Sequence, residues 1–516
     1  MNYEFQMLPN EFWWGGTSVD GSKEPFDQNS VCFHDFRTHV NNQTMPLYIS
    51  NFGRCIWSEQ PFQCRIENGI FKMDGENIVL ENFGTCLKDA YLGAMHKYFP
   101  VQGEPLQEEF FQVPQYNTWM QFTYDQTQKG VMEYAKGIIA NGFKPGILMI
   151  DEGWQKDYGQ WEFDLLKFPE PEKMLKELHE MGFTVMLWVV PYVSPNGKFF
   201  IKHTKPWLSN TEIEEYFLRT ENGDAALMEW WNGVSAMLDF TKPCDCAFLD
   251  AQLKKLMNMG VDGFKFDGGS LEQYAEVSNK SNAPLSEDST PAQRNIAWND
   301  FGTRYKFHEY KDTFKGGGKR VIQRIRDRNH SWDNDGLNTL IPNALLQGLL
   351  GHPFVCPDMI GGGEWTYREL GIPVDRELFV RMAQCSAFFP MMQFSWAPWE
   401  AVDAEHLAFI KKAHDLHCDF AEEILTFVNE AYETGEPIIR NLEYNHPHCG
   451  YEKITDAFML SDKYLIAPVI QKGQTTRQIP LPEGTWRGFD GKTYEGSQTV
   501  ELPVTLADIP WFCKST

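Results

Sequence analysis

The alternation of apolar and polar positions divides the 516-residue chain into three parts. The first part carries short alternating strands separated by Gly, Asn and Pro, as in "MPLYISNFGRCIWSEQPFQCRIENGIFKMDG" (45–75), which is typical of antiparallel β structure. The same texture returns near the end, as in "KYLIAPVI" (463–470). We therefore expect an N-terminal β domain at 1–113, a middle domain at 114–429 and a C-terminal β-sandwich domain at 430–516.

The middle part alternates short apolar runs with helical patterns. In "PEKMLKELHEMG" (171–182), for example, the apolar residues recur at helical spacing. Such alternation predicts parallel βα units, and a stretch of about 300 residues suits a (β/α)8 TIM barrel. The apolar runs that we assign to strands are 147–151, 183–192, 235–240, 261–267, 319–327 and 352–358.

A doubly wound parallel sheet is the alternative architecture. It normally places a glycine-rich phosphate turn after its first strand. The segment that follows the first strand here, "IDEGWQKDYG" (150–159), is no such turn. The α/β class with a barrel is therefore the preferred prediction.

The formal charge of −25 excludes some partners. Nucleic acids and anionic membranes attract basic surfaces, so we expect neither as a partner. No apolar run approaches the roughly 18 residues of a membrane span, and "MNYEFQMLPNEFWWGG" (1–16) lacks the features of a secretory signal. The eleven cysteines are scattered, with Cys244 and Cys246 forming only a Cys-x-Cys pair, so we expect reduced thiols, a cytoplasmic location, and neither a metal nor another cofactor.

Aspartates at the ends of the predicted strands are the main candidate chemistry. In a barrel, the carboxyl ends of all strands meet at one face, where the active site lies. A single strand-end aspartate is more often a turn former or helix cap, but several at one rim need balancing bases, a metal or a polar ligand. A sugar donates hydroxyl hydrogen bonds to carboxylates, whereas no HExxH or His-x-His spacing supports a metal. These aspartates are Asp151, Asp239, Asp267, Asp327 and Asp358.

Tryptophan supports the sugar interpretation, because an apolar ring stacks on the CH face of a pyranose. The chain has 17 tryptophans, a high count. Those near the predicted strand ends are Trp154, Trp188, Trp231, Trp396 and Trp399.

The stretch "DGFKFDGGS" (262–270) contains the strongest catalytic candidate. Two carboxylates suffice to cleave a glycosidic bond, and the nucleophilic one must stay ionised. Lys265 lies on the same side of the strand as Asp267 and could hold it ionised, although it could equally pair with another strand-end aspartate. The two glycines after Asp267 indicate either turn geometry or room for a ligand.

Several segments in order resemble glycoside hydrolase family 31 from about residue 45 onward. They include "GVDGFKFDGG" (260–269), which resembles the family's nucleophile strand, and "HPFVCPDMIGGG" (352–363). The resemblance implies a retaining glycosidase with Asp267 as the nucleophile. It also implies a sugar subsite formed by Asp151, Trp154, Trp188, Lys265, Asp358, Gln393 and Trp396.

The same resemblance points to Asp327 as the acid/base, because Trp332 follows it at the family's spacing. The family's Trp and Gly before the acid are replaced here by Ile325 and Arg326, and Asp335 is the alternative acid. A general acid is protonated before it acts, so we expect the pKa of Asp327 to be raised by the charge of Asp267 and by burial once a sugar excludes water. Arg324 and Arg326 would lower this pKa if their side chains point inward.

The departures from the family pattern bear on the substrate. The chain has "KFDGG" where α-glucosidases of the family have Trp-x-Asp-Met-Asn-Glu, and Gln393 and Ser395 replace an Arg-x-His pair. Both changes resemble the branch that includes the myogenesis-regulating glycosidase and bacterial α-galactosidases, which implies an α-galactoside. Action on an α-glucoside, α-xyloside or sulfoquinovoside, a lyase reaction and an inactive sugar-binding protein remain alternatives. The expected partner is a small glycoside or oligosaccharide, and the sequence leaves homo-oligomerisation open.

Overall fold

A computed structural model describes the whole chain except residues 39–41, 205–215, 281–284, 286–288 and 516. Its centre is a sheet of eight parallel strands in the order β21-β20-β18-β17-β13-β10-β9-β22. A bridge between Ile360 and Phe394 links the two ends of this sheet and nearly closes the barrel. The strands are β9 (Gln115–Asn117), β10 (Ile147–Ile150), β13 (Thr184–Val189), β17 (Gly263–Phe266), β18 (Phe307–Tyr310), β20 (Ile322–Arg324), β21 (Val355–Cys356) and β22 (Gln393–Phe394).

The barrel strands are short and almost wholly buried, because helices cover their outer faces and side chains fill the interior. Gly263 at the start of β17 is required by a close approach: a Cβ there would lie 2.1 Å from the carbonyl oxygen of Phe307 on β18. The neighbouring strands could not pair at this register with a larger residue.

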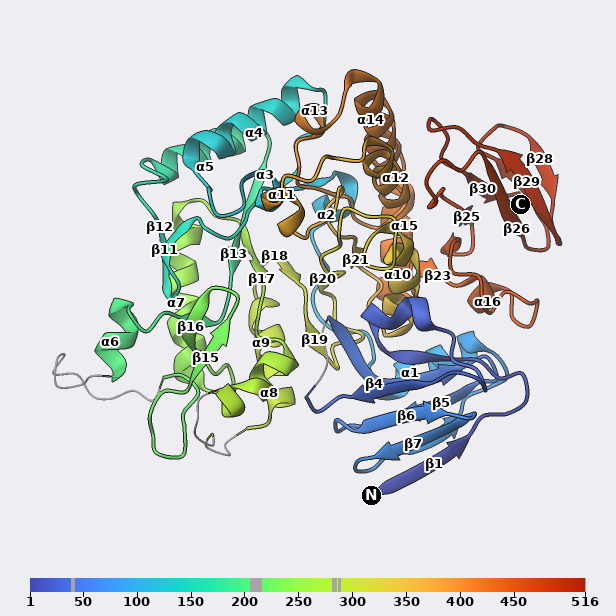
Figure 1. The fold of residues 1–516 in the computed structure, drawn as a ribbon, viewed down its shortest axis with the longest axis horizontal. Helices are drawn as coiled ribbons and strands as arrows, with labels where there is room; N and C mark the ends of the chain where they lie inside the picture. Colours follow the sequence, from blue (N-terminus) through green and yellow to red (C-terminus); the bar gives the residue numbers. More distant parts are fainter. Residues whose placement is uncertain (39–41, 205–215, 281–284, 286–288, 516) are drawn as a thin grey trace.

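Helices follow most of the strands and form the outer layer (Figure 1). Side-chain caps begin α4, α9, α12 and α14, and in α9 Thr290 and Gln293 form a capping box. The helices of four residues are α2 (Glu109–Gln112), α3 (Trp119–Phe122), α11 (Thr366–Glu369), α13 (Pro398–Ala401) and α16 (Leu442–Asn445). The longer ones are α1 (Leu87–Tyr98), α4 (Gln128–Ala140), α5 (Pro171–Glu180), α6 (Lys198–Thr204), α7 (Pro243–Met259), α8 (Leu271–Lys280), α9 (Pro291–Gly302), α10 (Leu340–Leu349), α12 (Arg376–Ser386), α14 (Ala404–Asp419) and α15 (Ala421–Thr434).

The predicted barrel is confirmed, but one of its predicted strands is wrong. The run 235–240 contributes β16 (Gly233–Met237), which pairs antiparallel with β14 (Tyr192–Val193) and β15 (Leu227–Trp230) in a small sheet beside the barrel. In the barrel, β13 pairs directly with β17. The apolar runs missed β18, on the other side of β17, because its sequence "FHEY" has only four residues and two polar side chains. Two further strands, β11 (Gln155–Asp157) and β12 (Gln160–Phe163), form a hairpin after β10.

The N-terminal β domain packs against one side of the barrel (Figure 1). Its two sheets enclose a core that includes Trp13, Tyr48 and Phe71. The barrel segment β19 (Thr313–Phe314) joins one of these sheets by pairing with β4, so the two domains share a sheet. The strands are β1 (Asn2–Gln6), β2 (Trp13–Thr17), β3 (Cys32–Asp35), β4 (Gln43–Ser50), β5 (Arg54–Trp57), β6 (Gln63–Glu67), β7 (Ile70–Asp74) and β8 (Val79–Asn82).

The C-terminal domain lies on a different side of the barrel, in red in Figure 1. It consists of a six-stranded sheet and a two-stranded sheet, with Trp486 and Phe512 from one packed with Ile479 and Leu481 from the other. The strands are β23 (Ile439–Arg440), β24 (Phe458–Leu460), β25 (Tyr464–Ile466), β26 (Thr476–Leu481), β27 (Thr485–Gly488), β28 (Thr493–Glu495), β29 (Gln498–Pro503) and β30 (Trp511–Lys514). Among the described helices of the chain, none has the length and apolar character to cross a bilayer.

Candidate active site

A cavity of about 160 Å³ opens at the carboxyl ends of the barrel strands. This is small compared with the roughly 300–1,000 Å³ of typical ligand pockets, and its position is the one at which barrel enzymes place their chemistry. Its walls combine acids, bases and aromatic rings. They are lined by Trp119, Tyr124, Asp151, Glu152, Trp188, Trp231, Lys265, Asp267, Lys311, Arg324, Asp327, Met359, Gly363, Glu364 and Trp365.

A larger cavity, of about 540 Å³, lies elsewhere on the barrel. It is lined by residues at the amino ends of β18 and β20, including Lys306 and Val321. Barrel enzymes place their catalytic residues at the carboxyl ends of the strands, so we do not expect an active site at the amino ends. The smaller cavity is therefore the candidate active site.

Asp267 follows β17 and points its carboxylate into the candidate site. Its Oδ2 accepts a hydrogen bond of 3.0 Å from the Trp188 indole N–H, and its Oδ1 accepts one of 2.9 Å from the Gly268 N–H. Burial alone would raise the pKa of Asp267, but the nearby charges of Lys311, Lys265 and Arg324 together hold this pKa below its usual value. Asp267 is thus ionised at neutral pH.

The two glycines after Asp267 serve the turn. Gly268 and Gly269 have φ values of +62° and +65°, in the left-handed region that favours glycine. A Cβ at Gly268 would lie 2.8 Å from the Tyr192 ring, and one at Gly269 would lie 2.8 Å from Trp298. The glycines therefore pack against protein, and the expectation that they leave room for a ligand is wrong.

Asp151 and Lys265 form a buried ion pair at the floor of the site. Lys265 Nζ lies 2.7 Å from Asp151 Oδ2, and the same oxygen accepts a 2.7 Å hydrogen bond from the Asn117 side chain. Lys265 is thus the direct partner of Asp151, and its charge lowers the pKa of Asp267 without an ion pair between the two. The alternative pairing that the sequence left open is the one observed.

Asp327 lies three residues beyond β20 and is held by two cations. Its Oδ2 is 2.5 Å from Lys311 Nζ and its Oδ1 is 2.7 Å from an Arg324 nitrogen. Burial opposes ionisation, yet the charges of Arg324 and then Lys311 bring the pKa of Asp327 far below its usual value. The opposing effect of Arg324, which the sequence analysis allowed for, is thus observed, and Lys311 adds a second cation that it did not anticipate. The raised pKa expected once a sugar excludes water stays a prediction.

Asp358 lies behind the cavity wall. It accepts hydrogen bonds of 3.0 Å from Arg324, 2.6 Å from the Arg328 N–H and 2.9 Å from the Gly363 N–H. Burial and the neighbouring charge of Asp327 raise the pKa of Asp358 to about 6. The position of Asp358 suits the placement of Arg324 and of the glycine loop rather than direct contact with a ligand.

Three further residues predicted to contact the sugar, like Asp358, do not line the cavity. Trp154 is fully buried and donates its indole N–H to the carbonyl oxygen of Trp188 at 2.8 Å. Gln393 is also fully buried and donates to the side chain of Gln115 inside the barrel. Trp396 packs against His330 and Phe379. Trp154 and Trp396 were predicted from positions near strand ends and Gln393 from the family resemblance, but each side chain packs inside the protein.

Asp239 is also corrected. It follows the misassigned strand β16, and its carboxylate accepts hydrogen bonds from the Thr241 N–H and hydroxyl at 3.1 and 2.6 Å. This is the turn-forming role that we weighed for a single strand-end aspartate. Asp335, the alternative acid, is also outside the cavity lining and pairs with Arg326 at 3.0 Å.

The sequence missed Lys311 and Glu152. Lys311 directly follows β18, so recognising that strand would have identified it. Glu152 follows Asp151 and accepts hydrogen bonds from the Tyr158 hydroxyl at 2.7 Å and from the Trp231 indole at 3.2 Å. Burial raises the pKa of Glu152 to about 8, with a further contribution from the charge of Asp151.

The N-terminal domain reaches the back of the site through Gln43. The Gln43 side-chain amide donates to the carbonyl oxygens of Lys311 and Arg324 at 2.7 and 3.0 Å, and its own oxygen accepts from the Ser18 hydroxyl at 2.8 Å. One buried glutamine thus binds the backbones of both cations that flank Asp327.

Comparisons with known proteins agree with this architecture. Residues 112–421 match the sequence model of the glycosyl hydrolases family 31 TIM-barrel domain, and residues 435–516 match that of the family 31 C-terminal domain. The dextranase of this family from Flavobacterium johnsoniae, solved with glucose, superposes with a TM-score of 0.84 at 19% identity, covering 99% of this chain and 66% of that chain.

Two curated relatives cover most of this chain. The myogenesis-regulating glycosidase of Mus musculus is 32% identical over 442 residues, which are 83% of this chain and 60% of the relative. Alpha-xylosidase XylQ of Lactiplantibacillus pentosus is 24% identical over 501 residues, which are 89% of this chain and 60% of the relative. The chain spans about 60% of the length of these two relatives. By these matches, the chain belongs to glycosyl hydrolase family 31.

Proposed function

We propose that this protein is a retaining, exo-acting α-glycosidase that hydrolyses a terminal α-linked sugar, with an α-galactoside as the substrate. The observation that carries this proposal is that Asp267 and Asp327, from the ends of two strands, line one small cavity in which Lys311 acts on both. Retaining glycosidases use two carboxyl groups about 5–5.5 Å apart, one as nucleophile and one as acid/base.

In the first step, Asp267 attacks the anomeric carbon. The bond from that carbon to the leaving oxygen breaks, an ester bond to Asp267 forms, and Asp327 gives its proton to the leaving oxygen. The Trp188 N–H keeps one oxygen of Asp267 in place while the other reacts. In the second step, water gives its proton to Asp327 and its oxygen to the anomeric carbon, which releases Asp267 and restores the α configuration.

The first step needs a proton on Asp327, although Lys311 and Arg324 favour its ionised form in the ligand-free site. We infer that Asp327 takes up this proton when the sugar enters and excludes water from the carboxyl groups. Calorimetry in buffers of different ionisation enthalpy would detect the proton as a buffer-dependent heat of binding.

The shape and charge of the cavity support a single neutral sugar. A volume of about 160 Å³ favours one terminal ring over an internal chain segment. Each of the three cations in the described cavity lining is already paired with a carboxylate: Lys265 with Asp151, and both Lys311 and Arg324 with Asp327. None is left for a sulfonate, which argues against a sulfoquinovoside.

The choice of an α-galactoside rests on the residues that differ from the α-glucosidase pattern. Lys265 stands where α-glucosidases of the family have a tryptophan, and it places an ammonium group at the floor of the site beside Asp151. The hydrogen-bond donors that a sugar would meet there therefore differ from those in the α-glucosidases. Gln393 and Ser395 are buried and do not line the cavity, so they contribute no donors to the sugar.

Aryl α-galactoside, α-glucoside, α-xyloside and α-sulfoquinovoside test this choice side by side, with the first-formed anomer followed by NMR. We expect the highest kcat/KM on the galactoside and a first-formed α-anomer. A preference for the xyloside would instead agree with the similarity to alpha-xylosidase XylQ. No release of the aryl group from any of the four would support an inactive sugar-binding protein, and a first-formed β-anomer would contradict retention.

Other features remain proposals. The sequence predicts the domains 1–113, 114–429 and 430–516. We propose to move the boundary between the last two from residue 429 to residue 434, because α15 runs unbroken to Thr434. All eleven cysteines are free thiols, which supports a cytoplasmic location.

A further inference from the structure

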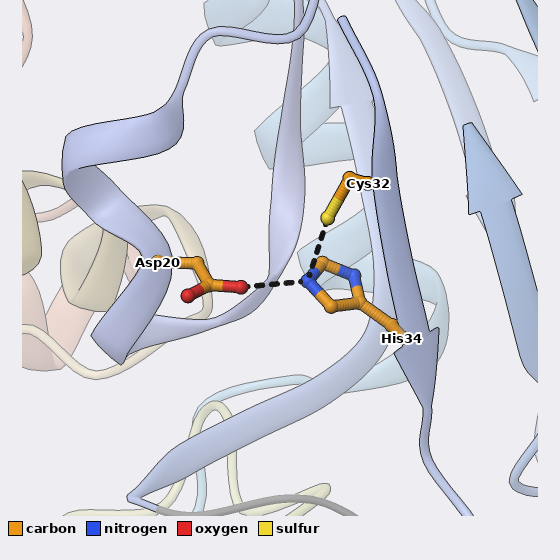
Figure 2. A group of neighbouring side chains, drawn as sticks. All are labelled: Asp20, Cys32 and His34. Carbon is orange, nitrogen blue, oxygen red and sulfur yellow. Dashed lines mark hydrogen bonds and ion pairs between the residues drawn. The ribbon is translucent and has the colours of Figure 1, made fainter. Parts of the chain in front are cut away.

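A second cluster of reactive side chains lies in the N-terminal domain, outside the candidate active site. Asp20 lies in the 3₁₀ helix η1 (Ser18–Lys23), and Cys32 and His34 lie on β3. Residues two apart on a strand point to the same side, so Cys32 and His34 both face Asp20. Figure 2 shows the three side chains pointing toward one another.

The spacing of the three side chains suits a metal ion. His34 Nε2 lies 2.9 Å from Asp20 Oδ2 and 3.4 Å from Cys32 Sγ, and the three ligand atoms all lie within 4.8 Å of one another. Tetrahedral zinc, with bonds of about 2.0–2.3 Å, separates its ligand atoms by roughly 3.3–3.6 Å. Cys32 Sγ already lies at this separation from His34 Nε2, whereas Asp20 Oδ2 lies closer to that nitrogen and would move away from it by roughly half an ångström.

The ring of His34 is oriented for this role. Its other nitrogen, Nδ1, is hydrogen-bonded to the buried Tyr48 hydroxyl at 2.5 Å. Metal-binding histidines commonly have the second nitrogen held in this way, which fixes the ring and directs the first nitrogen at the ion. The ring also lies against Gly16, where a Cβ would be 2.7 Å from His34 Cε1.

The charges around the cluster are also compatible with an ion. Lys23 pairs with Asp20 Oδ1 at 2.8 Å and leaves Oδ2 directed at His34. A bound divalent ion stabilises a cysteine thiolate, as in other cysteine sites.

We propose that Asp20, Cys32 and His34 bind one divalent cation of the zinc type, with water as the fourth ligand. The mixed sulfur, nitrogen and oxygen set favours zinc over magnesium or calcium, which prefer oxygen ligands alone. The sequence-based expectation of no metal rested on the Cys244 and Cys246 pair and on His-x-His motifs, and this Cys-x-His pair with a distant aspartate was not among them.

The ion would act on stability. It would join η1 to β3, and η1 packs on α10, where a Cβ at Gly21 would lie 2.3 Å from the Pro342 carbonyl oxygen. An ion that binds only the folded chain raises the melting temperature by mass action. The site is thus separate from the sugar chemistry, and its test needs no substrate.

The experiment uses the full chain, stripped of metal with a chelator and then titrated with Co²⁺ or Zn²⁺. We expect one Co²⁺ per chain with a thiolate-to-cobalt charge-transfer band, and a rise in melting temperature with Zn²⁺. Cys32→Ser should lose the band and the rise, and Asp20→Asn should weaken both. Cys449→Ser, at an exposed cysteine, is the matched control and should behave as the wild type.

Two outcomes would overturn the proposal. If the wild-type chain binds neither ion, the three side chains form a hydrogen-bonded cluster only. If Cys32→Ser keeps the cobalt band, the ion is bound by other cysteines. Because serine is close to cysteine in size, loss of the band in a variant with an unchanged unfolding transition reports the ligand and not the fold.

Discussion

The ammonium group of Lys265 lies 2.7 Å from the carboxylate of Asp151, and both side chains are only 3% exposed. Neither charge has access to bulk water, so each depends on the other and on the hydrogen bond from Asn117 for its stability. This pair forms the floor of the candidate site, so in the proposed function it would contact the sugar as well as stabilise the barrel.

The first prediction concerns this pair. Asp151→Ala should lower kcat/KM strongly, because sugar hydroxyls lose their acceptor, and should also destabilise the fold by about 3–5 kcal/mol, because Lys265 is left buried and unpaired. The double variant Asp151→Asn/Lys265→Met should recover much of the thermal stability without recovering kcat/KM. Recovery of both would mean that Asp151 has only a structural role.

The second prediction concerns Asp267 as nucleophile. Its carboxylate is ionised and positioned by Trp188, so Asp267→Ala should reduce turnover by about four to six orders of magnitude with the fold retained. A fluorinated glycosyl fluoride should label the wild-type enzyme, and peptide mapping should find the label on Asp267. A label on Asp151 or Asp327 would refute the assignment. Asp462→Asn, at an exposed aspartate in the C-terminal domain, is the control.

The position of Asp267 could be predicted from the sequence because a buried strand, a carboxylate and a glycine turn follow one another directly. The same holds for the overall barrel, since apolar runs and helical patterns alternate over most of the middle part. The error at 235–240 has a physical origin: β16 is as apolar as a barrel strand, and only its antiparallel partners distinguish it.

The side-chain directions could not be predicted. Trp154, Gln393 and Trp396 lie near strand ends, but local packing turns each of them away from the cavity. Lys311 was missed because β18 has no apolar run. With it were missed the largest nearby charge on Asp267 and one of the two cations that hold Asp327. The electrostatic surroundings of a carboxylate depend on contacts between strands far apart in sequence. Such contacts cannot be predicted from a single sequence.

The third prediction concerns the proton on Glu152. The pKa of free glutamate is about 4.3, whereas burial raises the pKa of Glu152 to about 8. Between these two pH values the folded state keeps a proton that the unfolded state loses. The contribution of Glu152 to the free energy of unfolding therefore falls as pH rises from about 4.3 to about 8. Glu152→Gln should remove this part of the pH dependence of the melting temperature. An unchanged dependence would show that Glu152 is already ionised at neutral pH, with the Tyr158 and Trp231 hydrogen bonds stabilising its charge.

The fourth prediction concerns Asp327 as acid/base. A leaving group that is already a good one needs no proton, so Asp327→Ala should strongly slow cleavage of a natural disaccharide and largely spare the first step with a glycosyl fluoride or dinitrophenyl glycoside. Azide should restore turnover in the variant, because it takes the place of water in the second step without needing a base, and the product should be the α-glycosyl azide.

The removal of Asp327 leaves Lys311 and Arg324 without this partner, so the thermal transition is measured in parallel. Asp327→Asn, which keeps the shape, separates lost chemistry from lost stability. If Asp335→Ala shows the leaving-group dependence and Asp327→Ala does not, Asp335 is the acid, although its pairing with Arg326 outside the cavity argues against that result.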